Sequence, residues 1–144
     1  MKDARLILSL LVLVAASVFA LSCGRSSSSS HRLQSITLTP ATADAQDFPN
    51  GMVQFTATGQ YDTPPMAVTP LSATWGVCAS QFQPTNEVSV TNTGVAHCAS
   101  GAVGTYTVWA NDPADLPPGF YTCTAETACG GGCVIQASAQ LTCP

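Results

Sequence analysis

The chain has 144 residues, of which 46% are hydrophobic and only 8% are charged, and its formal net charge is −4. An average globular domain carries about 25% charged residues. This composition therefore excludes a coiled coil, a charge-rich disordered tail and a basic nucleic-acid-binding protein. The length predicts a single domain.

The N-terminal region contains an uncharged apolar run at residues 6–20, LILSLLVLVAASVFA, after a short start that carries Lys2 and Arg5. This length is typical of the apolar core of a secretory signal and is short of the ~20 residues that span a bilayer as a helix. A retained signal anchor is the alternative, but the run ends in small residues and a cysteine. We predict that residues 1–22 form a cleaved signal peptide.

The end of this run, Phe19-Ala20-Leu21-Ser22-Cys23, resembles the lipobox of bacterial lipoproteins. The resemblance implies that Cys23 becomes the first residue of the mature chain and carries a diacylglyceryl group and an acyl chain such as palmitate. Two or more acyl chains anchor a protein stably. Gly24 stands where an Asp would act as a retention signal, which implies the outer membrane, with the periplasmic or the surface face left open.

The residues after the anchor form a serine-rich tether. Residues 23–32 contain the run GRSSSSSHR, which is typical of a flexible coil that holds a domain away from the membrane. His31 lies in this tether without an apparent partner.

The remaining six cysteines predict a disulfide framework, because an even number of cysteines in an exported chain is typical of paired thiols. Six cysteines allow fifteen connectivities. They are Cys78, Cys98, Cys123, Cys129, Cys133 and Cys143.

From residue 33 onward, apolar residues alternate with Thr, Ser and Gln, which is the pattern of half-buried β-strands. Turn-forming clusters such as Asn92-Thr93-Gly94 separate the alternating runs. No stretch after the signal has a capped helical pattern. Short strands at this spacing predict an all-β sandwich or barrel. The runs cover 36–38, 53–57, 73–77, 88–90, 106–110 and 135–141.

Four segments in order carry a resemblance to a known domain family: LQSITLTPATA, VQFTATGQYDT, SATWGV and VSVTNTGVAHCASGAVGTYTVWA. Together they resemble the bacterial Ig-like group 2 domain, in the cysteine-rich lipoproteins common in acidobacteria. The resemblance covers residues 33–111. It implies an immunoglobulin-like Greek-key β-sandwich over residues 33–144, with Trp75 in the core and a cysteine-rich insertion at about 112–133.

The same resemblance implies a first disulfide. It places Cys78 just beyond the Trp75 strand and Cys98 at a position that is usually small and buried, which favours Cys78–Cys98. The four later cysteines would then staple the insertion to the last strand. Cys129–Cys133 with Cys123–Cys143 is one of three options for them.

Residues able to carry catalysis are few. His97 is the only histidine within residues 33–144, and it stands beside Cys98. Neighbouring residues of a strand point to opposite faces, so the two cannot form a nucleophile–base pair. We therefore expect no enzyme and no resident cofactor.

Three carboxylates provide a candidate calcium site. Asp62 follows one predicted strand, and Asp112 and Asp115 follow another that ends on the same side of an Ig-like sandwich. Carboxylate oxygens suit Ca²⁺. The alternative is that these side chains cap their own loops.

Trp109 is out of phase with the apolar face of its strand and is predicted to point outward. Either the insertion, with Phe120 and Tyr121, folds over it, or the three aromatic residues form an exposed ligand-binding patch.

These observations predict a lipid-anchored envelope protein whose domain serves surface recognition or adhesion, with a protein or a glycan as its partner. The alternative is an architectural role, as a spacer or as an accessory subunit of an envelope complex. Fold alone does not choose between them.

Overall fold

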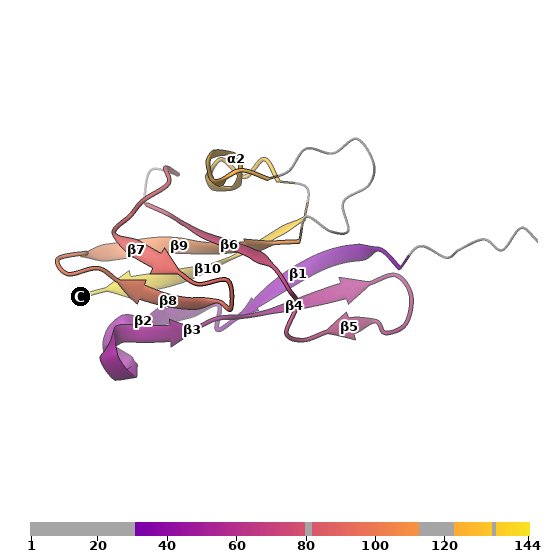
Figure 1. Ribbon diagram of the computed structural model, residues 1–144, viewed down its shortest axis with the longest axis horizontal. Coiled ribbons are helices and arrows are strands. Elements are labelled where there is room, and N and C mark those ends of the chain that lie inside the picture. Colours follow the sequence, from indigo (N-terminus) through magenta and orange to yellow (C-terminus); the bar gives the residue numbers. More distant parts are fainter. Residues whose placement is uncertain (1–30, 80–81, 113–122, 134) are drawn as a thin grey trace, which may run out of the picture.

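The computed structural model describes residues 31–79, 82–112, 123–133 and 135–144 (Figure 1). The predicted signal peptide, the lipidation residue Cys23 and most of the tether lie outside the described residues, as do Asp115, Phe120 and Tyr121. Within the described part, no helix is long and apolar enough to cross a membrane.

The fold is all-β, as the alternating pattern predicted, with two 3₁₀ turns and one short α-helix among the described residues. The strands are β1 (Leu33–Thr39), β2 (Thr42–Asp44), β3 (Met52–Gln54), β4 (Thr56–Tyr61), β5 (Ala67–Val68), β6 (Thr74–Cys78), β7 (Val88–Val90), β8 (Val95–Cys98), β9 (Gly104–Asn111) and β10 (Gln136–Cys143). The helical turns are η1 (Ala45–Asp47), η2 (Pro49–Gly51) and α2 (Ala125–Cys129).

The strands form one four-stranded and two three-stranded sheets, in the orders β2-β10-β9-β6, β1-β4-β5 and β3-β8-β7. All pairings are antiparallel except that of β10 with β2, which is parallel. The arrangement is consistent with an Ig-like Greek-key sandwich.

The predicted strand at 53–57 is interrupted at Phe55. The Phe55 amide donates to the carbonyl of Gly94, at 2.9 Å, outside the strand ladders. As a result, β3 before it pairs with β8, whereas β4 after it pairs with β1. The sequence alternation runs unbroken through this point because Val53, Phe55 and Ala57 all face the core.

One hydrophobic core joins all three sheets. Its members alternate along the strands with exposed Thr, Ser and Gln residues, as the sequence predicted. Burying an aliphatic or aromatic side chain of this kind contributes roughly 1.5–3 kcal/mol. The fully buried large residues are Val53, Phe55, Val108 and Leu141, and Trp75 packs half-buried at the margin of the core.

The helix α2 was not predicted. Only five residues long, it is too short for a helical periodicity to be visible in the sequence. It begins after Thr124, whose hydroxyl accepts a hydrogen bond from the Thr127 amide. In Figure 1 it lies outside the strands, near β6 and β9.

Candidate functional site

Trp109 lies on the outer face of the four-stranded sheet and is covered. Its indole ring packs on Gly76 of the neighbouring strand β6, where a Cβ atom would overlap the ring carbon Cζ2. Only 3% of Trp109 is exposed. It forms a small hydrophobic cluster with Cys78, Ala128 and Cys129, separate from the main core.

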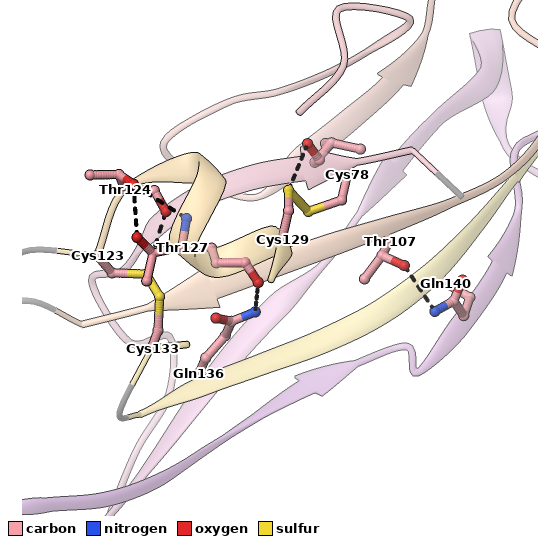
Figure 2. Close-up of a disulfide and its surroundings, with 11 residues drawn as sticks. Cys78, Thr107, Cys123, Thr124, Thr127, Cys129, Cys133, Gln136 and Gln140 are labelled. Carbon is pink, nitrogen blue, oxygen red and sulfur yellow. Dashed lines mark hydrogen bonds between the residues drawn. A yellow bond between two sulfur atoms is a disulfide. The ribbon is translucent and has the colours of Figure 1, made fainter. Parts of the chain in front are cut away.

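The cover over Trp109 is α2, which two disulfides hold in place (Figure 2). Cys129 at the end of α2 bonds to Cys78 on β6. Cys123, which precedes α2, bonds to Cys133, which follows it. The side-chain amide of Gln136 donates to the carbonyl of Ala128 at 3.0 Å. We call residues 123–133 the cap.

The acidic residue at the start of the helix also favours this turn. The pKa of Glu126 is held below its usual range by hydrogen bonds to its carboxylate from its own backbone amide and from Thr124. A carboxylate in the first turn of a helix is favourable because the free N–H groups carry partial positive charge.

The observed disulfides correct the predicted pairing. They are Cys78–Cys129, Cys98–Cys143 and Cys123–Cys133. Cys78–Cys98 is wrong because Cys78 belongs to the small cluster with Trp109 under the cap, whereas Cys98 packs against the main core. Cys78 faces the cap with Trp109, and Cys98 faces the end of β10. The prediction that all six cysteines are paired is confirmed.

Trp109 is therefore not part of an exposed ligand patch. The alternative prediction, that the insertion covers it, is confirmed for the described part of the insertion, with α2 as the cover.

Asp62, one of the predicted calcium ligands, has hydrogen-bond partners. The Asp62 carboxylate accepts hydrogen bonds from the Arg32 amide, at 2.8 Å, and from the Thr63 hydroxyl. Because Arg32 lies 30 residues away, the shorter of these bonds joins two segments and does not cap the loop of Asp62 itself. Asp112 is buried, with 6% exposed. Among the described residues, no group of three or more His, Cys, Asp or Glu side chains is suited to a metal ion. Asp115 lies outside them, so the calcium site stays a prediction.

The two histidines differ from each other in setting. His97 is exposed on β8, and its neighbour Cys98 is bonded to Cys143 and carries no free thiol. The expectation that His31 has no partner is wrong: its ring stacks on Tyr61, with centroids 3.9 Å apart, and its Nε2 lies 3.2 Å from the Pro65 carbonyl.

The structure also contains a groove of about 270 Å³ that the sequence did not predict. It lies where β3 passes into β4, between the segment before β6 and the turn that joins β7 to β8. We call it the Trp75 groove. The residues that give it chemical character are Gln54, Thr56, Ser72, Trp75, Asn92 and Thr93.

The walls of the Trp75 groove are fixed by hydrogen bonds between its segments. Both hydrogens of the Gln54 amide donate to backbone carbonyls, those of Phe55 at 2.7 Å and Thr93 at 2.8 Å. The Leu71 amide donates to the carbonyl of Ala57 at 2.8 Å. Each wall is thus tied to the β3–β4 segment.

Gly94 lies against the indole ring of Trp75, one of the residues that line the groove. Its φ of +82° is a conformation that side-chain-bearing residues rarely adopt, and a Cβ there would approach Trp75 Cζ2 to 2.9 Å. The sequence signal for this site was the Asn92-Thr93-Gly94 turn. The alternation of apolar and polar residues could not reveal that this turn folds against Trp75, because the turn and Trp75 lie on different segments of the sequence.

A scan of protein-family models finds no match to the chain, and a search of curated proteins finds none.

Proposed function

We propose that the chain is a lipoprotein of the cell envelope, anchored in the outer membrane through Cys23, and that its domain binds a ligand without catalysing a reaction. The observation that carries this proposal is the set of three disulfides. Disulfides form and persist in oxidising compartments outside the cytoplasm. The lipobox-like sequence ending in Cys23 supports the same location.

Binding is favoured over catalysis because the candidate nucleophile Cys98 has no free thiol. Cys98 is in a disulfide, so His97 beside it has no thiol to activate. The Trp75 groove, by contrast, is a preformed concavity on a fixed frame. Preformed concave sites with a few polar groups are typical of ligand binding.

Lipidation is tested by expressing the full chain in a bacterium with labelled palmitate and separating the membranes. The wild-type chain and the tether variant Ser28→Ala, the matched control, should carry label in the outer-membrane fraction. Cys23→Ala should carry none and leave that fraction. A Cys23→Ala chain that stays labelled and membrane-bound would overturn the anchor.

Recognition is tested by co-sedimentation of the detergent-solubilised full chain with envelope preparations. Saturable binding that a soluble extract of envelope polysaccharide or protein competes away is expected for a recognition module. A fixed 1:1 association with one envelope protein, without competition, would instead indicate the architectural role.

A further inference from the structure

The Trp75 groove has an uncharged lining. Among the described residues that form its walls, the polar groups are hydroxyls and amides, and none is ionisable. An ionic ligand would meet no opposite charge here, and its desolvation would be uncompensated. The groove therefore selects for a neutral ligand that can form several hydrogen bonds.

The apolar residues that line the groove include Trp75, whose indole ring is held in a fixed position. Trp75 is half-buried, packs against the core and rests against Gly94. An indole combines a large apolar face with low conformational freedom, so it binds a flat ligand surface at a small entropic cost. Pro70 adds a second rigid apolar surface at the rim.

The hydrogen-bonding residues that line the groove together with Trp75 come from different segments. Thr56 follows the break at Phe55, Ser72 precedes β6, and Asn92 stands at the tip of the β7–β8 turn. Since both Gln54 amide hydrogens are already used, its Oε1 atom is left as an acceptor. Hydrogen-bond donors and acceptors thus line the same groove as the indole ring.

We infer that the Trp75 groove is a binding site for a neutral saccharide. A pyranose ring presents an apolar face of C–H groups, which suits Trp75, and a rim of hydroxyls, which suits the side chains around it. The volume of about 270 Å³ lies slightly below the roughly 300–1,000 Å³ found for pockets of drug-sized ligands, which suits a ligand as small as one sugar ring. The inference rests on the proposed recognition function and names its ligand class.

The test uses the full chain in detergent and a panel of short neutral oligosaccharides of hexoses and N-acetylhexosamines. Binding is followed by intrinsic fluorescence, because the chain has two tryptophans and the other, Trp109, is buried under the cap. At least one oligosaccharide should change the emission at millimolar concentration or below. The double variant Ser72→Ala/Asn92→Ala should weaken this binding at least tenfold. For Trp75→Leu, which lacks the fluorescent reporter, isothermal titration calorimetry replaces fluorescence, and binding should be abolished.

The double variant is informative even if Trp75→Leu fails to fold, because Ser72 and Asn92 are exposed. Its matched control is Gln60→Ala/Ser89→Ala, two exposed polar residues outside the groove, which should bind like the wild type. No binding by any oligosaccharide, or binding that both double variants retain equally, would overturn the saccharide site. Palmitate labelling at Cys23 and co-sedimentation with envelope protein would be unaffected, so this failure is distinct from failure of the proposed function.

Discussion

Gly76 illustrates how one missing side chain shapes the outer face of the domain. The indole of Trp109 occupies the space that a Cβ at residue 76 would fill. Trp109 is held from the other side by α2, so it has nowhere to move. Because residue 76 has no side chain, the Trp109 ring can pack directly on β6 beneath the cap.

Gly76→Ala should therefore destabilise the protein by about 1–3 kcal/mol, the usual cost of overpacking. Denaturant unfolding of the oxidised protein measures this difference. Gly130→Ala is the control, since its Cβ would meet only ordinary contacts, the nearest at 3.4 Å, and its φ of −79° suits alanine. Equal stability of the two variants would contradict the close packing of Trp109 on Gly76.

A second residue-scale interaction joins β9 to the loop before β7. The Tyr106 hydroxyl donates to the Glu87 carboxylate at 2.7 Å. This hydrogen bond, with burial and the negative charge of Glu87, raises the pKa of Tyr106 above its ordinary value of 10.0. The folded state therefore favours the neutral phenol.

Because the pKa is raised on folding, this contribution to stability is complete below about pH 10 and is lost as the pH rises through the folded-state pKa. Tyrosinate absorbance should reveal a tyrosine that titrates above pH 10 in the wild type and is missing in Tyr106→Phe. Glu87→Gln should move that titration downward. An unchanged curve in Glu87→Gln would show that the carboxylate is not the cause.

At the scale of elements, the cap is a helical turn that depends on its covalent links. A single turn of helix is not stable alone, since nucleation is unfavourable. Here Thr124 caps its start, and the Cys78–Cys129 bond fixes its end to β6. The disulfide and the burial of Trp109 thus stabilise each other.

Removing that bond in Cys78→Ala/Cys129→Ala should cost up to about 4 kcal/mol, from a loop of 51 residues. It should also expose Trp109, with a red shift in emission and stronger quenching by acrylamide. Cys98→Ala/Cys143→Ala, which opens a loop of 45 residues, is matched in entropic cost and lies away from the cap. If both variants exposed Trp109 equally, α2 would not be the element that covers it.

Across the whole molecule, the alternation of apolar and polar residues predicted the strands, because successive side chains of a strand point alternately to the core and to solvent. The break at Phe55, the helix α2 and the disulfide partners were missed. Each depends on contacts between distant segments: Phe55 with Gly94, α2 with Trp109, and Cys98 with Cys143. The Trp75 groove was missed for the same reason.

The disulfide connectivity can be tested directly on the whole protein. Peptide mapping of the non-reduced exported protein should recover Cys78–Cys129, Cys98–Cys143 and Cys123–Cys133, with no free thiol among these six. A Cys78–Cys98 peptide would contradict this fold, because Cys78 lies in the cluster under the cap and Cys98 packs against the main core.

The pairing of β1 with β4 determines how the domain would respond to mechanical tension. Leu33, next to the tether, pairs with Tyr61, whereas the Trp75 groove adjoins the opposite end of this pair, where Thr39 meets Thr56. A pull between the tether and a ligand held in the groove would act along the two strands in opposite directions. Their hydrogen bonds would be loaded together in shear instead of opening one at a time, so the β1–β4 pair would resist a pull in this direction.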